Sequence, residues 1–143
     1  MKILIINGPN LNLLGSREPD VYGHTTMDDI ISGLRAEFND IEISYYQSNH
    51  EGDLIDRLHE AAYGHCRADA VVLNAGGYTH TSVALADAVA AIAPIPVVEV
   101  HISNVHAREP FRRQSYLSPV CTGTITGFGT KVYALAICAL ARL

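Results

Sequence analysis

The sequence has little of what several large classes of protein depend on. Lys and Arg together number 10 against 15 Asp and Glu, which gives a net charge of −5, whereas a nucleic-acid binder needs a basic face. No apolar run reaches the roughly 20 residues that a membrane-spanning helix requires. The apolar start at 3–6 is too short for a signal peptide. We therefore expect a cytoplasmic protein with neither nucleic acid nor a membrane as its partner.

Cysteine is scarce as well. Cys66, Cys121 and Cys138 are odd in number and lack the spacing of metal ligands, so the sequence predicts no metal site and no disulfide framework. We expect three buried, reduced thiols, as in a cytosolic protein. What is present, 143 residues with 48% hydrophobic and 17% charged side chains, suits one compact domain over 1–143 with a sizeable core.

Five predicted strands alternate with helical patterns along the chain. The expected strands are 2–6, 41–45, 70–73, 97–101 and 122–126. A variant capping box of Thr26 and Asp29 begins the first helix, a second helix covers 54–62, Thr79 or Thr81 caps the third, and a final apolar helix covers 131–143. This alternation predicts an α/β fold, a doubly wound five-stranded parallel sheet with the flavodoxin-like order 2-1-3-4-5.

Polar residues follow four of the expected strands at their carboxyl ends. They are Asn7 and Asn10, then Asn49, then Asn74, then His101. Ligands of open α/β sheets bind at this edge. Each asparagine alone is typical of a turn, but four strands that end this way predict a binding site.

The stretch 96–116 holds the largest group of side chains that could act in catalysis or anion binding. Side chains two apart on a strand share a face, so Glu99 and His101 point the same way. A buried carboxylate needs a partner, and His101 is the nearest candidate, with its other nitrogen left free for proton transfer. Arg108 and Arg112 stand four apart on a predicted helical turn, and Arg113 follows. This combination predicts a site where a small anion undergoes acid–base chemistry.

The segment 11–25 is a long loop between the first strand and the first helix. It holds Gly15, Arg17, Tyr22 and Gly23. Loops of this length in compact domains are usually functional or disordered. Glycines near both ends would let this one act as a lid.

Three stretches carry a resemblance to a known family. They read NGPNLNLLGSREPDVYGH, NAGGYTHTSVALADA and EVHISNVHAREPFRRQSY. In order and spacing they closely resemble the type II 3-dehydroquinate dehydratases of the shikimate pathway, from Ile3 to the last helix. Pro110, Gln114 and His24 depart from the residue types common there. The resemblance implies a hydro-lyase without a cofactor, which removes water from 3-dehydroquinate through an enolate to give 3-dehydroshikimate for aromatic amino acid biosynthesis.

The same resemblance implies that Tyr22 is the catalytic base, acting as a tyrosinate. A free tyrosine has a pKa of about 10, so ionisation near neutrality requires a pKa lower by roughly 2–3, or about 3–4 kcal/mol. The charge of Arg17, five residues upstream, is the expected cause, with Arg108 as a second possibility.

Further roles follow from the resemblance for residues at the strand ends. Asn10 would stabilise the enolate through an ordered water, and His101, held by Glu99, would protonate the departing hydroxyl. The backbone N–H groups of Ile102 and Ser103 would bind the substrate carboxylate.

The remaining implied substrate-binding residues are Asn74, His80, Arg112 and Asp87. The first three would bind the carboxylate and ring hydroxyls. Asp87 matches a residue that the family contributes across a subunit boundary, which implies a homo-oligomer, a dodecamer of trimers.

Two other classes deserve weight. The first is a flavodoxin-like binding or signalling module, either a flavin carrier or a phosphoryl receiver. A receiver needs acidic residues after its first strand, where this chain has 7–10 as Asn-Gly-Pro-Asn. A flavin carrier would be coloured as purified. Gly123, Gly127 and Gly129 lack the spacing of a nucleotide-binding loop.

The second alternative is a Schiff-base dehydratase, which needs a desolvated lysine at a strand end. Lys2 and Lys131 are the only lysines. One lies at the chain start and the other opens the last helix, so neither suits that role.

Overall fold

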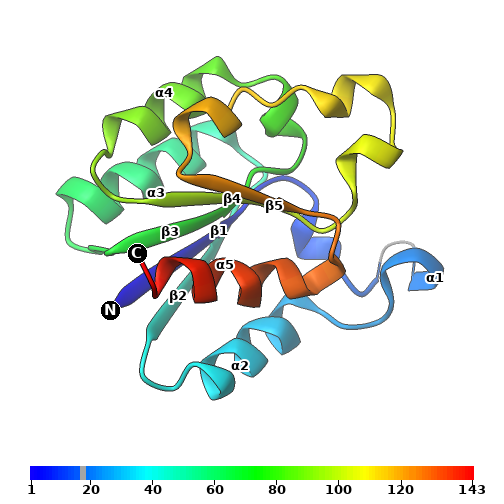
Figure 1. Cartoon of the computed structure of the whole chain (residues 1–143), viewed down its shortest axis with the longest axis horizontal. Coiled ribbons are helices and arrows are strands. Elements are labelled where there is room, and N and C mark those ends of the chain that lie inside the picture. Colours follow the sequence, from blue (N-terminus) through cyan, green and yellow to red (C-terminus); the bar gives the residue numbers. More distant parts are fainter. Residues whose placement is uncertain (17–18) are drawn as a thin grey trace.

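The computed structural model describes residues 1–16 and 19–143, with the backbone alone for residues 21 and 22. Five parallel strands form one sheet: β1 (Lys2–Asn7), β2 (Glu42–Gln47), β3 (Ala70–Asn74), β4 (Val97–His101) and β5 (Gly123–Thr126). Their order is β2-β1-β3-β4-β5 (Figure 1). The predicted fold class and strand order are therefore confirmed.

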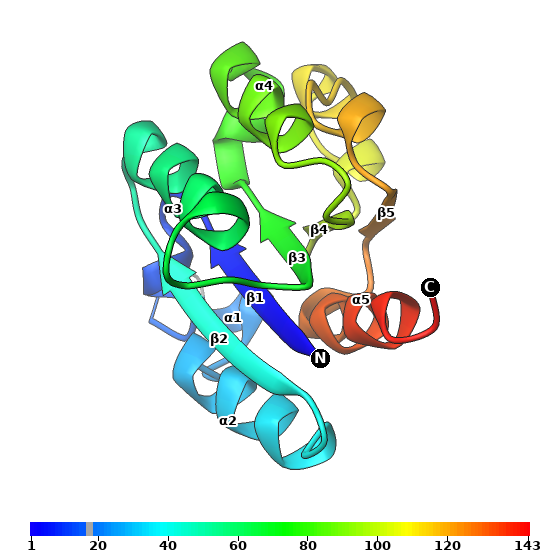
Figure 2. The same cartoon turned by 90° about the vertical axis from the view of Figure 1, so that its left-hand side faces the viewer.

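Helices cover both faces of the sheet (Figure 2). One face carries α3 (Glu51–Tyr63) and α4 (Val83–Ala91), and the other carries α2 (Met27–Glu37) and α5 (Val132–Leu140). Leu4 and Ile6 of β1 point into the first layer, and Ile3 and Ile5 point into the second. Because β1 is buried on both faces, its sequence is a continuous apolar run.

Of the two predicted helix caps, the structure confirms one. Thr26 and Asp29 form the predicted capping box: Asp29 N–H donates to Thr26 Oγ1 over 3.2 Å, and Thr26 N–H donates to Asp29 Oδ2 over 3.1 Å. The prediction that Thr79 or Thr81 caps the third helix is wrong. Ser82 caps α4 by accepting from Leu85 N–H, because the preceding residues Gly76–His80 form a separate 3₁₀ turn.

The predicted loop 11–25 contains two short helical segments, the 3₁₀ turn Leu11–Leu13 and helix α1 (Pro19–Tyr22). The stretch after β4 likewise forms two 3₁₀ turns, Val105–Ala107 and Pro110–Arg113. The last helix, predicted to reach 143, ends at Leu140. Within the described ranges, no helix is long and apolar enough to cross a membrane.

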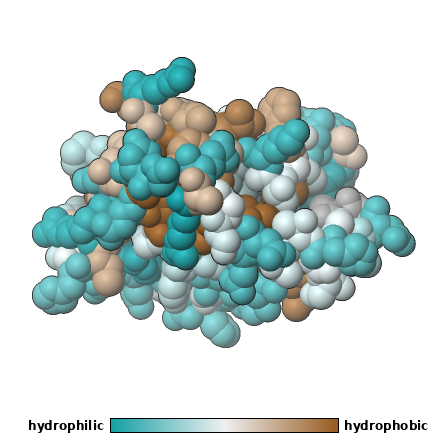
Figure 3. Space-filling model, turned by 90° about the horizontal axis from the view of Figure 1, so that it is seen from below, coloured by the Kyte–Doolittle hydropathy of each residue, from teal (hydrophilic) through white to brown (hydrophobic). Residues whose placement is uncertain are grey.

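The prediction of three buried thiols is wrong for two of them. All three cysteines are free, but Cys66 and Cys138 are exposed and Cys121 is partly buried. Cys66 lies in the bend after α3, and Cys138 is an exposed residue of α5, whose buried residues include Tyr133 and Ile137. Seen from below, the surface is largely polar, with apolar residues exposed in small separate areas (Figure 3).

The carboxyl ends of β1, β3 and β4 meet at one edge. Asn7 and Asn74 are partners in the register of β1 and β3, and Gly8 N–H donates to Asn74 O over 2.7 Å. A Cβ on Gly8 would collide with the backbone carbonyl of Ala75, so only glycine lets the two loops pack this closely. This backbone contact forms the base of the candidate site.

Candidate functional site

A pocket of about 280 Å³ opens at the carboxyl edge of the sheet. The loops after β1, β3 and β4 form its walls. Of the residues predicted for the site, it is lined by Asn10, Asn74, His80, His101, Ile102, Ser103, Arg108 and Arg112. The structure therefore brings together residues that lie up to about a hundred positions apart in the chain, at the edge where ligands of such sheets bind.

The predicted pairing of Glu99 with His101 is confirmed. His101 Nε2 lies 2.7 Å from Glu99 Oε1, Glu99 is fully buried, and His101 is 8% exposed. Burial opposes ionisation of Glu99, but hydrogen bonds from His101, Ser118 and Ser115 outweigh it and hold the pKa of Glu99 at about 2. Glu99 is thus a carboxylate.

The protonation of the His101 ring follows from its partner. An ionised carboxylate only accepts hydrogen bonds, so the proton of this contact is on His101 Nε2. The other ring nitrogen, Nδ1, has no hydrogen-bond partner among the described residues, and His101 lines the pocket. It can therefore exchange a proton with a bound molecule.

Three hydroxyl groups around Glu99 were missed by the sequence analysis. Ser115 Oγ donates to Oε1 over 2.7 Å, Ser118 Oγ donates to Oε2, and Thr124 Oγ1 donates to Oε2 over 3.1 Å. Thr124 is the register partner of Glu99 across β4 and β5, so strand pairing could have found it. Nothing in the local sequence indicates the two serines.

His80 places a second imidazole beside the first. Its ring lies nearly parallel to that of His101, with 6.3 Å between centroids and an interplanar angle of 22°. Its Nδ1 lies 2.7 Å from the carbonyl oxygen of Gln114. Because a carbonyl only accepts, Nδ1 carries the proton of that contact, and Nε2 is left for a ligand.

Two arginines make the pocket basic. Arg108 donates from Nη1 to Ser103 Oγ over 3.3 Å. Arg112 donates from Nε to Glu109 Oε2 over 2.7 Å and lies over the Phe111 ring, 5.0 Å from its centroid. The contact with Arg112 lowers the pKa of the exposed Glu109 carboxyl. Each guanidinium is thus oriented by one hydrogen bond within the protein, and its other N–H groups can bind an anion.

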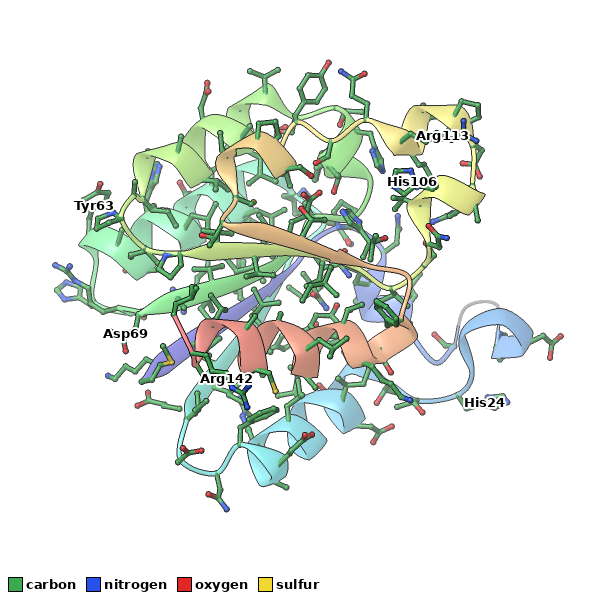
Figure 4. All side chains as sticks on the ribbon, in the orientation of Figure 1. His24, Tyr63, Asp69, His106, Arg113 and Arg142 are labelled. Carbon is green, nitrogen blue, oxygen red and sulfur yellow. The ribbon has the colours of Figure 1, made fainter. Side chains whose placement is uncertain are left out.

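Two further basic residues lie on the segment that follows β4. Figure 4 places Arg113 and His106 on the segment after β4, whereas Asp69 and Tyr63 lie at the opposite end. Arg113 is exposed and is not among the pocket-lining residues.

Asn74 is held from behind by a buried network. Its Nδ2 donates to Tyr133 Oη over 3.0 Å, its Oδ1 accepts from Gly76 N–H over 3.3 Å, and Tyr133 Oη donates to Asn7 Oδ1 over 2.8 Å. Burial raises the pKa of Tyr133 well above its usual range, so the phenol stays neutral. The sequence indicates Asn7 only as a strand-end residue and carries no signal that points to Tyr133.

The backbone around the pocket is fixed by hydrogen bonds. Asn10 has a left-handed φ of 71°, and its N–H donates to Asn49 Oδ1 over 3.0 Å. The carbonyls of Ile102 and Ser103 accept from Gly129 N–H and Thr126 Oγ1. Asn10 is exposed and lines the pocket.

Four predicted site residues are not among those that line this pocket, and one of them is Glu99, which is fully buried beside His101. Arg17 and the side chain of Tyr22 lie outside the described residues. Asp87 is exposed on α4 and does not line the pocket of its own chain. Across the described part of the chain, no group of three His, Cys, Asp or Glu side chains could hold a metal ion.

Comparison with known proteins gives a consistent result. The family model described as "Dehydroquinase class II" matches residues 1–141. A 3-dehydroquinate dehydratase of Exiguobacterium sp. is 59% identical over 145 residues, covering 98% of this chain and 94% of the relative. The 3-dehydroquinate dehydratase 1 of Corynebacterium efficiens is 55% identical over 143 residues, covering 99% and 92%.

Solved structures agree. The type II dehydroquinase of Butyrivibrio crossotus superposes with a TM-score of 0.92 at 47% identity, covering 99% of this chain and 97% of that chain. A 3-dehydroquinate dehydratase-like protein of Bifidobacterium longum gives a TM-score of 0.71 at 31% identity, covering 99% and 96%.

Proposed function

The chain belongs to the class II dehydroquinase family, and on that premise we propose that it is a 3-dehydroquinate dehydratase. This hydro-lyase removes water from 3-dehydroquinate to give 3-dehydroshikimate in the shikimate pathway. The observation that carries the proposal is the buried Glu99–His101 pair, whose free Nδ1 belongs to a pocket lined by Arg108 and Arg112. A proton donor beside two guanidinium groups suits a carboxylate substrate that loses a hydroxyl.

The first half of the reaction is removal of a proton next to the ketone. Tyr22 acts as a tyrosinate base, and the charge of Arg17 lowers its pKa. Asn10 stabilises the enolate through an ordered water, with Arg108 adding positive charge nearby. The exposed Asn10 side chain at the pocket supports this role.

The second half is departure of the hydroxyl. His101 donates a proton from Nδ1 to the leaving oxygen, while Glu99 keeps the other ring nitrogen occupied. The hydrogen-bond geometry of the pair supports that direction of transfer. One proton goes from the substrate to Tyr22, and one goes from His101 to the departing hydroxyl, which leaves as water. Tyr22 then loses its proton and His101 regains one, so the enzyme returns to its starting state.

Substrate binding is assigned to the rest of the pocket. Backbone N–H groups of Ile102 and Ser103 bind the substrate carboxylate. The side chains of Asn74, His80 and Arg112 bind the carboxylate and the ring hydroxyls. The free Nε2 of His80 and the remaining N–H groups of Arg112 support this assignment.

We also propose that the whole chain is one catalytic domain of a cytoplasmic homododecamer built from trimers. Asp87 then reaches the site of an adjacent subunit, where its partner is Arg112. Asp87 is exposed, which leaves it available for such a contact. Within its own chain Arg112 already pairs with Glu109, so Asp87 would join that ion pair as a second carboxylate.

The deciding experiment is an ultraviolet assay for the conjugated enone formed from 3-dehydroquinate. The assembled protein should produce the signal, and His101→Ala should remove most of it while leaving the fold intact. Folded protein that produces no enone would contradict the proposed function. Purified protein with the colour of a flavin would point instead to a binding module.

A further inference from the structure

The Glu99 side chain accepts four hydrogen bonds from the described residues. Oε1 accepts from His101 Nε2 and Ser115 Oγ, each over 2.7 Å, and Oε2 accepts from Ser118 Oγ and from Thr124 Oγ1. A carboxylate has about four lone-pair sites. The four donors therefore fill the acceptor capacity of a side chain that has no contact with solvent.

The donors come from three parts of the chain. His101 lies on the same strand as Glu99, Thr124 lies on the adjacent strand β5, and Ser115 and Ser118 lie on the segment that joins the 3₁₀ turn Pro110–Arg113 to β5. Ser115 Oγ also accepts from Leu117 N–H and Ser118 N–H, so it stabilises a local turn as well. Among the described residues, the hydroxyls of Ser118 and Thr124 make no hydrogen bond to the backbone, and their one contact besides Glu99 joins Thr124 Oγ1 to Ser118 Oγ over 3.3 Å.

The state of Glu99 decides what His101 can do. A buried carboxylate without enough donors takes up a proton. A neutral Glu99 would then donate to His101 Nε2, and the pair would no longer favour a positive charge on the ring. A carboxylate at Glu99 instead keeps the proton of this contact on Nε2 and stabilises an imidazolium that can donate from Nδ1.

We propose that Ser118 and Thr124 are positioning residues for the proton transfer by His101, because their hydroxyls hold Glu99 as a carboxylate. They do not line the pocket, so they act only through Glu99. This inference rests on the proposed dehydration, in which His101 is the proton donor.

Other titratable groups near the pair do not replace this role. The His80 ring is 6.3 Å from that of His101, and its Nδ1 is engaged with the Gln114 carbonyl. Burial and the charge of Glu99 raise the pKa of Cys121 to about 12, so that thiol stays neutral. Arg108 and Arg112 line the pocket, where their side-chain hydrogen bonds go to Ser103 and Glu109 rather than to Glu99.

The test uses Ser118→Ala and Thr124→Val, singly and combined, in the assembled enzyme. Thr124→Ser keeps the hydroxyl and should behave as the parent. Thr122→Val is the matched control, because Thr122 Oγ1 accepts from Val97 N–H and is not among the described donors to Glu99.

The first measurement is infrared spectroscopy of the carboxyl band against pH without substrate, with the spectrum of Glu99→Gln subtracted to isolate Glu99. Each lost hydrogen bond to a charged acceptor should raise the pKa of Glu99 by roughly 1.5, so the double variant should titrate near pH 5. The parent, Thr124→Ser and Thr122→Val should stay ionised down to pH 4. This reading does not depend on turnover, so it separates failure of the inference from failure of the proposed function.

The second measurement is kcat and KM against pH. At pH 8 the double variant should approach the parent, whereas at pH 4 only about a tenth of its Glu99 would be ionised, so kcat should fall about tenfold further than in the parent. KM should change less than twofold. If Glu99 of the double variant stays ionised at pH 4, or if Thr124→Ser loses activity like Thr124→Val, the inference is overturned. A fall of kcat that is equal at all pH values would also overturn it, since that is the mark of a merely structural role.

Discussion

Replacing Tyr133 by phenylalanine tests whether the buried network behind the pocket controls the pocket itself. Tyr133 is fully buried on α5, and its hydroxyl accepts from Asn74 and donates to Asn7. Tyr133→Phe removes one oxygen and keeps the ring, so the packing of α5 against the sheet should not change. The effect is then confined to the two hydrogen bonds.

The loss of stability can be worked out from the hydrogen bonds that Asn7 and Asn74 lose and keep. Two neutral hydrogen bonds contribute about 0.5–1.5 kcal/mol each, and a buried oxygen left without a donor costs about 1–3 kcal/mol. Asn7 Oδ1 loses its phenol donor, whereas Asn7 Nδ2 keeps its 3.4 Å contact with Tyr45. We expect the free energy of unfolding to fall by about 2–4 kcal/mol, which for a chain of this size lowers the melting temperature by roughly 5–15 °C.

The functional effect should appear in binding. Without Tyr133 Oη, the Asn74 amide loses the acceptor that fixes its orientation and turns more freely. Since Asn74 is proposed to bind substrate, KM should rise about fivefold, the equivalent of about 1 kcal/mol, with kcat nearly unchanged.

Tyr45→Phe is the control, because Tyr45 is only partly buried and makes the longest contact of the network. It should cost less than about 1 kcal/mol and leave KM unchanged. Denaturant unfolding and steady-state kinetics on both variants decide the matter. If Tyr133→Phe matches Tyr45→Phe in both measurements, the network does not hold Asn74.

Three further predictions concern mechanism and assembly. Borohydride added with substrate should not inactivate the enzyme, and substrate trapped on Lys2 or Lys131 in a mass spectrum would contradict the tyrosinate route. Arg17→Ala should lower kcat about a hundredfold or more, because the tyrosinate needs about 3–4 kcal/mol of stabilisation, and a rise in KM alone would make Arg17 a simple substrate clamp. Asp87→Ala should weaken substrate binding and lower the unfolding temperature. Tyr22→Phe should abolish turnover and leave the assembly intact, as measured by sedimentation. A fully active monomer would show that the active site is not shared between subunits.

The parts of the fold that the sequence predicts well depend on neighbours in the chain. Apolar patterns located the first four strands, and the capping box of Thr26 and Asp29 is a pattern within four residues. The start of α4 was missed because three hydroxyl residues, Thr79, Thr81 and Ser82, compete within four positions. The choice depends on the preceding 3₁₀ turn, in which Gly76 takes a positive φ of 59°.

The features that the sequence does not predict depend on contacts between residues far apart in the chain. Tyr133 contacts Asn7 across 126 positions, and Ser118 contacts Glu99 across 19 positions of irregular chain. No periodicity encodes such contacts. Likewise, the exposure of Cys66 depends on where α3 ends, which local sequence defines only to within a few residues.

The buried Glu99 carboxylate requires more partners than His101 alone. A glutamate inside an apolar strand requires partners, and that reasoning found His101. One imidazole fills a single acceptor site, however, while a fully buried carboxylate has about four, so the same physics demands further donors from adjacent elements. In the predicted sheet order, the fifth strand lies beside the fourth, and its threonines alternate with other residues, so a hydroxyl opposite Glu99 was the natural second donor. The observed contact with Thr124 shows that counting unfilled acceptor sites on a buried charge, together with strand order, extends a predicted site beyond its motif.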